Sequence, residues 1–187
     1  MAWRTRGHRG DLLEDLIDIS NEYYRVNEIA RVDKIATPIK VVEQNNRGQV
    51  ILGFFEKRST VDYVGLCQGI PLCFDAKETS AMSIPLANFH DHQIEYMKDF
   101  RKQGGISFFL VYFKAEEKFF LVPLELVIEA RKNAESGGRK SISFALCEKK
   151  AIPVGFLNHH LLHYLPAINV YLDQLQAEKE RELASRP

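Results

Sequence analysis

Two apolar, strand-like runs meet at Gln68-Gly69, and the reversal there decides which side chains face each other. Glycine tolerates the positive φ that tight hairpins demand, so this pair predicts a two-residue loop. Counting outward from that loop places Asp62 directly opposite Asp75, and directly opposed Cβ atoms lie about 4.5–5.5 Å apart. Lys77 points from the same face as Asp75, because side chains alternate along a strand. The hairpin therefore gathers two carboxylates and one ammonium in a small patch.

This patch has the composition of a site for a hard divalent cation. Two close carboxylates repel each other, and a bridging cation relieves that repulsion. Magnesium is held by one or two carboxylates and keeps several waters, one of which can be a nucleophile. Lys77 would orient that water or offset charge on a phosphorane-like transition state. An ion pair on the solvated face of a hairpin has the same spacing, so the residues alone leave both interpretations open.

Length and composition limit the class of protein. The chain has 187 residues, 45% of them hydrophobic, which is enough for one compact domain with a sizeable core. Lys and Arg number 25 and so do Asp and Glu, so any DNA affinity must come from local basic patches. Three cysteines without metal-type spacing suit a reduced compartment. The apolar run at 108–113 is too short to span a bilayer, and the start lacks a signal-peptide apolar region. We expect a cytoplasmic protein without membrane association.

Hydrophobic periodicity and turn signals predict a mixed α/β order in which helices flank a central sheet. The first predicted helix spans 11–30, begins at Asp11 as N-cap and buries a stripe formed by Leu12, Leu16, Ile19, Tyr23 and Val26. The other predicted elements are strands at 37–43 and 49–55 around a turn at 45–48, a helix at 88–102, a hairpin of strands at 106–113 and 118–122, a helix from Pro123 to about 133, and a helix at 167–183.

The histidines do not form a promising metal site. His90 and His92 fall in a predicted helix, where side chains two positions apart diverge by about 200°. His159, His160 and His163 lack a nearby carboxylate or cysteine partner, which favours a capping or interface role over zinc binding.

Two basic segments are candidate phosphate contacts. In Gly137-Gly138-Arg139-Lys140, paired glycines let backbone amides converge on an anion and the adjacent cations add charge. A flexible surface loop has the same composition. Residues 1–10, which include Arg9, carry basic side chains and no acid, and are either a disordered start or an arm that touches phosphate.

The pattern Asp62…Asp75-x-Lys77 resembles the core of PD-(D/E)xK nucleases. Around it, the segments "STVDY", "FDAKET", "PLANFHDHQIEYM", "GGI" and "GGRKSI" stand in the order found in RecU-type Holliday junction resolvases. The segments "RGDLLEDLIDISNEYY" and "TPIKVV" also resemble that family, and the similarity runs from about Arg9 to about Gly155.

The resemblance implies one nuclease domain over 1–187 with a restriction-endonuclease-like fold, a mixed central sheet flanked by helices. It also implies a protruding β-hairpin stalk at about 41–58, whereas a C-terminal helix at about 166–187 has no assigned function. The implied activity is a Mg²⁺- or Mn²⁺-dependent endonuclease that resolves four-way (Holliday) junctions by symmetric cleavage in recombination and repair. The implied partners are branched DNA, a second copy in a homodimer, and recombination proteins.

Residue roles follow from the same resemblance. Asp62 and Asp75 are the implied metal ligands, joined by the Ala76 carbonyl, and Lys77 positions the attacking water. Glu14 and Gln93 match accessory residues near the catalytic carboxylates. The candidate DNA contacts are basic residues of the start, the stalk and the Gly-Gly loop: Arg9, Arg47, Lys57, Arg58, Arg139 and Lys140.

Two positions depart from many relatives, which have glutamate where Asp75 stands and threonine where Val61 stands. The shorter aspartate predicts altered metal affinity or preference, and valine brings no hydroxyl beside Asp62. Two alternative functions stay open: a nuclease of the same fold that cuts other DNA substrates, and a catalytically weak junction-binding protein that recruits recombination or replication factors.

Overall fold

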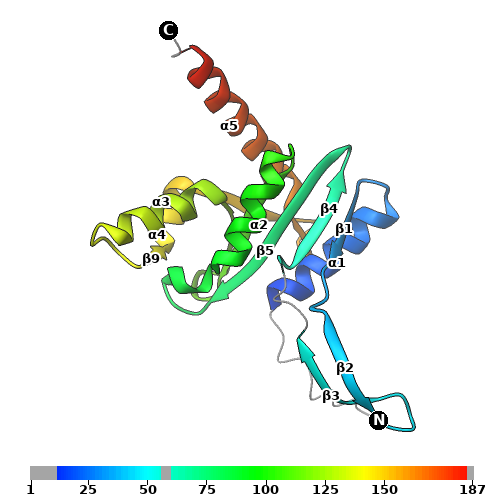
Figure 1. Ribbon diagram of the computed structural model, residues 1–187. Coiled ribbons are helices and arrows are strands. Elements are labelled where there is room, and N and C mark those ends of the chain that lie inside the picture. The colour runs from blue at the N-terminus through cyan, green and yellow to red at the C-terminus, as the bar shows by residue number, and fades with distance from the viewer. Residues whose placement is uncertain (1–11, 56–59, 185–187) are drawn as a thin grey trace.

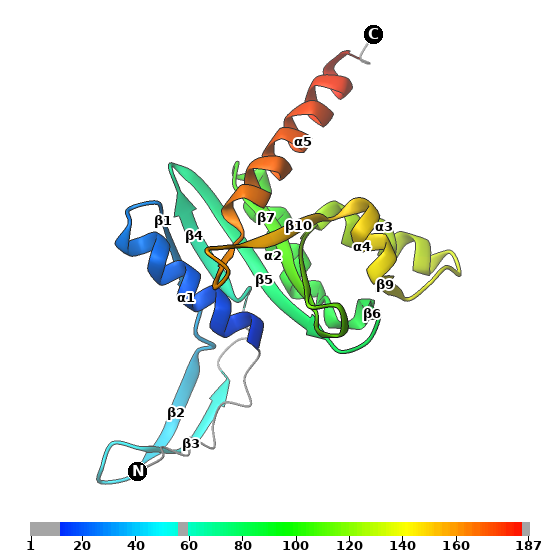
Figure 2. The ribbon, with the colours of Figure 1, turned by 180° about the vertical axis from the view of Figure 1, so that it is seen from behind.

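A seven-stranded mixed sheet is the centre of the computed structural model, which describes residues 12–55 and 60–184 (Figures 1 and 2). The strand order is β1-β4-β5-β7-β8-β10-β11, and β5 pairs with β7 in parallel while the other neighbours are antiparallel. These strands are β1 (Ala30–Lys34), β4 (Tyr63–Cys67), β5 (Ile70–Thr79), β7 (Ile106–Phe113), β8 (Lys118–Pro123), β10 (Ile152–Leu157) and β11 (Leu161–His163).

Helices cover both faces of this sheet. They are α1 (Leu12–Val26), α2 (Asp91–Lys102), α3 (Leu124–Glu135), α4 (Phe144–Lys150) and α5 (Leu165–Ala184), with 3-10 turns η1 (Leu86–Asn88) and η2 (Lys114–Glu116). One core cluster lies between the sheet and α1 with the start of α5, and a second lies between the sheet and α2, α3 and α4. Strand β7 is buried along its whole length, as expected for a strand covered on both sides. The predicted fold class is confirmed.

The hairpin of β4 and β5 has the predicted register. Cys67 pairs with Ile70 and Tyr63 pairs with Phe74, across a turn in which Gln68 and Gly69 have φ of 48° and 86°. Side chains alternate along β5, so Phe74 packs in the α1 core and Cys73 in the α2 core. Asp75, the next residue after Phe74, therefore faces the same side as Cys73.

Strand β5 connects to its parallel neighbour β7 through a crossover that carries α2. The crossover contains the short strand β6 (Ser83–Pro85), which pairs with β9 (Ser141–Ser143), and then η1. Parallel neighbours need such a connection, usually a helix. The crossover packs the first turn of α2 against the face of β5 that carries Asp75.

The buried stripe of α1 differs from the predicted one. Leu12, Ile19, Tyr23 and Val26 are exposed, whereas the buried face consists of Leu13, Ile17, Ser20, Asn21 and Tyr24. Apolar residues occur on two sides of this helix, and hydrogen bonds let two polar residues enter the core. The Ser20 hydroxyl donates to the Leu162 carbonyl at 2.8 Å, and Asn21 Oδ1 accepts from the Tyr164 hydroxyl.

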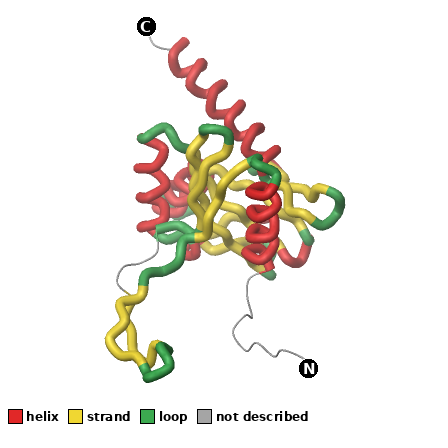
Figure 3. The backbone as a smooth tube through the Cα atoms, turned by 90° about the vertical axis from the view of Figure 1, so that its right-hand side faces the viewer, coloured by secondary structure: helices red, strands yellow, loops and turns green. Residues whose placement is uncertain are grey.

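A separate hairpin projects from the body of the protein (Figures 1 and 3). It consists of β2 (Ile39–Gln44) and β3 (Val50–Phe55), and we call it the stalk. At its tip, Asn45 Oδ1 accepts hydrogen bonds from the backbone amides of Arg47 and Gln49, both at 2.9 Å. The predicted strands and turn are thus present, and the apolar side chains of Ile51, Leu52 and Phe54 are exposed and lie outside the core.

The two histidines before Gln93 do not diverge as predicted. Helix α2 begins at Asp91, so His90 precedes it in extended backbone. The His90 and His92 rings stack with centroids 5.5 Å apart. The predicted divergence of about 200° is therefore wrong, because His90 is not helical.

The last helix, α5, leaves the body and ends far from it (Figures 1 and 2). Its first turns are buried through residues such as Ala167, Ile168 and Tyr171, and its later turns are largely exposed. In the part of the chain that the structure describes, no helix is both long and apolar enough to cross a membrane.

Candidate functional site

Asp75 is the centre of the candidate site. Its side chain is completely buried, 0% exposed, on the face of β5 that is covered by α2. Oδ1 accepts a hydrogen bond from Gln93 Nε2 at 2.5 Å. Oδ2 forms an ion pair with the Lys77 ammonium. A carboxylate oxygen has two lone pairs, so Oδ2 can bind a cation in addition to its contact with Lys77.

The Asp62 side chain is hydrogen-bonded to the backbone of β5. Asp62 lies one residue before β4, and its Oδ2 accepts a hydrogen bond from the Ala76 amide at 2.9 Å. Its own carbonyl accepts from the Ile35 amide at 2.7 Å. Val61, the preceding residue, is fully buried in the α2 core. These contacts place the Asp62 carboxylate beside Asp75, as the hairpin register requires.

The two carboxylates perturb each other. Burial, followed by the charge of Asp62, raises the pKa of Asp75 to about 7, although Lys77 acts in the opposite direction. Two carboxylates and one ammonium leave the site with net negative charge when all three are ionised. A bound cation would favour the ionised form of Asp75.

Lys77 has little freedom. Its side chain is only 16% exposed, and its ammonium is held against Asp75. An ammonium has three donors, and the ion pair leaves donors available for a water or a phosphate oxygen. The structure therefore brings Asp62, Asp75 and Lys77 together, as the sequence predicts.

Gln93 is oriented from both ends of its amide. Its Oε1 accepts the backbone N–H of His90 at 3.3 Å, at the start of α2, and its Nε2 donates to Asp75. The first contact fixes which end of the amide faces the carboxylate. The predicted position of Gln93 beside the site is thus present in the structure.

Glu14 lies on the opposite side of the sheet. It is on α1, where its Oε2 accepts from the Lys34 ammonium at 2.8 Å. Among the described residues, no hydrogen bond or ion pair joins Glu14 to Asp62 or Asp75. The acid that ties α1 to β5 is Glu78, whose Oε2 accepts the Leu13 amide at 3.3 Å. Sequence reasoning missed Glu78, although it directly follows Lys77 in the motif.

The donor set fits a hard divalent cation. Among the described residues, no group of three or more His, Cys, Asp or Glu side chains could hold a metal ion. Two carboxylates are available, and Oδ2 of the buried Asp75 has a lone pair beyond its contact with Lys77. This matches the needs of Mg²⁺, which takes one or two carboxylates and completes its shell with waters and substrate phosphate.

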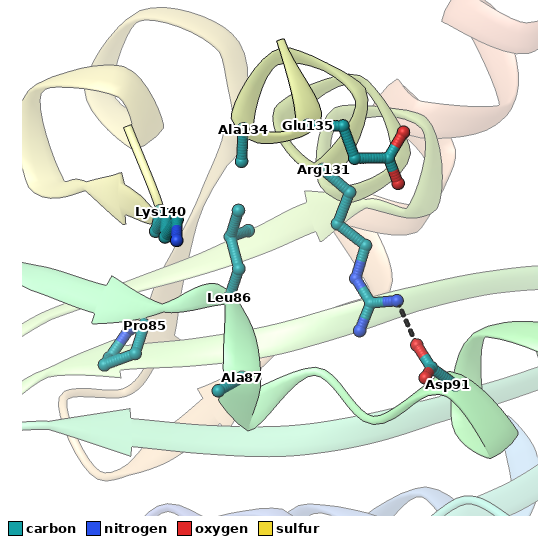
Figure 4. A pocket seen from close by; sticks show the side chains of 8 residues that line it. All are labelled: Pro85, Leu86, Ala87, Asp91, Arg131, Ala134, Glu135 and Lys140. Carbon is teal, nitrogen blue, oxygen red and sulfur yellow. Dashed lines mark hydrogen bonds and ion pairs between the residues drawn. The ribbon is translucent and has the colours of Figure 1, made fainter. Parts of the chain in front are cut away.

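A pocket of about 790 Å³ adjoins the start of α2 (Figure 4). Its charged lining residues are Asp91, Arg131, Glu135 and Lys140. Arg131 forms an ion pair with Asp91 and donates to the Phe89 carbonyl, so it braces the segment that leads to Gln93. Arg131 lies on α3 without any motif around it, and nothing in the sequence indicated this role.

The predicted DNA contacts are scattered over the surface. Arg139 and Lys140 are exposed, and neither forms an ion pair with another described side chain. Arg47 is exposed at the tip of the stalk. Arg9, Lys57 and Arg58 lie outside the described residues, as does the predicted N-cap Asp11.

Comparison with known proteins gives a consistent result. The family model described as "Recombination protein U" matches residues 8–170. "Holliday junction resolvase RecU" of Pediococcus pentosaceus is 37% identical over 174 residues, 90% of this chain and 87% of that protein. The protein of the same name from Oenococcus oeni is 35% identical over 167 residues, 87% of this chain and 85% of that one. A third, from Lacticaseibacillus casei, is 40% identical over 141 residues, 73% and 68% of the two chains.

Among solved structures, the chain is similar to Archaeoglobus fulgidus Hjc, a Holliday junction resolvase from an archaeal hyperthermophile. The TM-score is 0.39 at 13% identity, over 62% of this chain and 78% of that one. The sequence matches, which cover most of the chain and include the hairpin with Asp62, Asp75 and Lys77, decide the assignment. The chain belongs to the RecU family.

Proposed function

We propose that this protein is a metal-dependent endonuclease that resolves four-way DNA junctions in recombination and repair. The observation that carries the proposal is the buried carboxylate of Asp75, held beside Asp62 and Lys77 in a chain whose relatives are named Holliday junction resolvases. The choice of four-way junctions as substrate rests on the names of the relatives. The proposed metal-dependent hydrolysis rests on the arrangement of Asp62, Asp75 and Lys77.

Asp62 and Asp75, with the Ala76 carbonyl, would hold Mg²⁺ or Mn²⁺. Such an ion would polarise the scissile phosphate and lower the pKa of a water, which makes hydrolysis possible near neutral pH. The shorter side chain of Asp75, compared with glutamate, moves the ligand oxygen closer to β5. We therefore expect the preference between the two ions to differ from that of relatives with glutamate.

The remaining residues position the reactants. The Lys77 ammonium donates to the attacking water or to the phosphate, where negative charge develops. Gln93 holds Asp75 Oδ1, and Oδ2, which pairs with Lys77, would be the oxygen left to bind the ion. Arg131 braces the start of α2 from behind.

DNA would be held by cations from several parts of the chain. Lys140 lines the pocket of Figure 4, and Arg139 precedes it in the chain. Arg47 lies at the tip of the stalk. We also propose phosphate contacts for Arg9, near the N-terminus, and for Lys57 and Arg58, which follow the stalk in sequence. Phosphate contacts of this kind give affinity without sequence selectivity.

A homodimer would match the symmetry of the junction, because two opposed strands are cut by two equivalent sites. The stalk supports this proposal. Its apolar side chains are exposed in the single chain, among them Ile51 at 59% and Phe54 at 62%. A partner surface or the open centre of the junction would cover them.

The test is cleavage of a synthetic four-way junction with mobile arms, compared with linear duplex of the same sequence, in Mg²⁺ and in Mn²⁺. We expect paired symmetric nicks near the branch point. The matched control is Asp33→Asn. Asp33 is an exposed residue of β1 that pairs with Arg31, so this variant should keep normal cleavage activity. Equal cleavage of junction and linear duplex would mean that the protein is a nuclease for other DNA substrates. Tight junction binding without metal-dependent cleavage would mean that the protein binds junctions and recruits other factors.

Gln93→Leu should lower the single-turnover cleavage rate by about 10-fold, because it removes the donor that orients Asp75 and leaves Oδ1 unsatisfied. A hydrogen bond to a charged group contributes about 1.5–3 kcal/mol, and about 1.4 kcal/mol corresponds to tenfold in rate. The control is Gln103→Leu, at the other end of α2 and exposed. Equal rates for the two variants at saturating enzyme would contradict the positioning role.

Arg139→Ala combined with Lys140→Ala should weaken junction binding and flatten its salt dependence. Each phosphate contact contributes about 0.9 to the slope of log K against log salt, so the slope should fall by about 1–2. Binding is measured by fluorescence anisotropy in Ca²⁺, with Lys149→Ala on α4 as control. An unchanged slope would mean that the Gly-Gly loop does not touch DNA.

A further inference from the structure

A groove lies between the C-terminal end of α2, the start of α3 and the middle of α5. It encloses about 930 Å³. Four cationic side chains and six apolar ones account for most of its lining: Lys98, Arg101, Lys102 and Lys179, with Ile70, Ile106, Leu124, Ile128, Leu172 and Leu175. We call it the α2–α5 groove.

The rim of the α2–α5 groove is basic. No acidic residue lines it among those that the structure describes. Two of its four cations form ion pairs with acidic residues that do not line the groove. Arg101 pairs with Glu125, and Lys102 pairs with Asp99. Lys98 and Lys179 have no ion pair with a described side chain. The groove therefore keeps positive charge that a ligand can neutralise.

Its floor is apolar. Ile106 and Leu124 are buried beneath it, and Ile128, Leu172 and Leu175 are half-buried. On α5 the lining positions Leu172, Leu175 and Lys179 recur at helical spacing, so one stripe of this helix forms a wall. Helix α5 itself continues beyond the body (Figures 1 and 2).

The groove is separate from the catalytic site. Lys98, Arg101 and Lys102 lie in the last turns of α2, whereas Gln93 lies in its first turn. At 1.5 Å per residue, Gln93 and Lys102 are about 14 Å apart along the helix axis. A ligand in the groove would leave the Asp75 side of α2 free.

We propose that the α2–α5 groove binds an acidic amphipathic segment of a partner protein. Its apolar side chains would cover the floor, and its carboxylates would face Lys98 and Lys179. A DNA backbone would satisfy the cations but would place hydrated phosphates over buried aliphatic side chains, which fits the floor poorly. Helix-in-groove recognition combines apolar anchors on one stripe with flanking charges in this way.

The test uses a fluorescein-labelled, 14-residue helical peptide with leucines at i, i+3, i+4 and i+7 and glutamates between them, titrated into the full chain. We expect saturable binding, weakened at least about 10-fold by Lys98→Glu with Lys179→Glu. Leu175→Asn should weaken it too. Lys149→Glu, an exposed lysine of α4 without an ion pair to a described side chain, should have no effect. A peptide with lysines in place of the glutamates should not bind.

Junction cleavage and oligomeric state are measured on the same variants. Both should be unchanged by Lys98→Glu with Lys179→Glu, since neither residue belongs to the proposed catalytic site or its DNA contacts. Loss of junction binding would overturn the proposal and make the groove a DNA surface. A shift in oligomeric state would overturn it in favour of a second copy. The proposal would also be overturned if the peptide did not bind, or if Lys149→Glu weakened binding as much as Lys98→Glu with Lys179→Glu.

Discussion

Asp75→Asn is expected to lower the rate of metal-dependent junction cleavage by about 10³-fold or more, while junction binding in Ca²⁺ stays within about twofold. The amide keeps the shape of the carboxylate but loses the charge that holds the ion, and a catalytic ion contributes several kcal/mol to transition-state stabilisation. Single-turnover rates at saturating enzyme measure this. Asp33→Asn, which removes an exposed carboxylate of β1, should cleave at the normal rate.

The same substitution should stabilise the fold at alkaline pH. Burial beside Asp62 raises the pKa of Asp75 from 3.8 to about 7. Between these values the folded chain holds a proton that the unfolded chain has released, so the free energy of unfolding falls as pH rises. Asparagine removes this loss, and we expect a gain of about 1–3 kcal/mol at pH 8 without metal. Near pH 4 the two proteins should have similar stability.

Urea unfolding at both pH values, in EDTA, checks this expectation. The difference between Asp75→Asn and the unsubstituted chain isolates position 75 from the other titrating groups. Saturating Mg²⁺ should stabilise the unsubstituted chain and have little effect on the variant, because a ligand that binds only the folded state adds to its stability. Equal destabilisation at both pH values would mean that the fold requires the charged carboxylate, contrary to the site proposed above.

Lys77→Met should lower the cleavage rate by about 10²–10³-fold, the usual effect of removing one donor that stabilises developing charge. It should also move the pH–rate profile. Lys77 lowers the pKa of Asp75, so its removal raises that pKa further, and the rising limb of the profile shifts to higher pH. This shift separates a role at Asp75 from a purely structural one.

Lys118→Met is the control for Lys77→Met. Lys118 lies on β8 and pairs with Glu148 at 2.9 Å, and both side chains are about half exposed. Exposed pairs contribute little to stability, so cleavage and its pH dependence should be unchanged. A normal pH profile for Lys77→Met, together with a slower rate, would contradict the electrostatic role and leave only contact with the substrate.

Local features of the sequence are enough to predict the register of the β4–β5 hairpin. A two-residue turn at Gln68-Gly69 and the side-chain period of two are local properties, so the pairing of Tyr63 with Phe74 followed without knowledge of any distant contact. The stalk hairpin, the hairpin of β7 and β8, and helices α1, α2, α3 and α5 were predicted from similar local signals. The first helix ends at Val26 and not at residue 30, and the elements β1, β6, β9, α4, β10 and β11 were not predicted. The family motifs then located Asp62, Asp75 and Lys77.

Tertiary structure decided what surrounds these residues. The buried face of α1 depended on partners as distant as Leu162, because apolar residues occur on two sides of the helix. Gln93 met Asp75, and Arg131 met Asp91, only through the packing of α2 and α3 on the sheet. The raised pKa of Asp75 is likewise a property of burial, which arises when distant segments of the chain exclude water from one carboxylate.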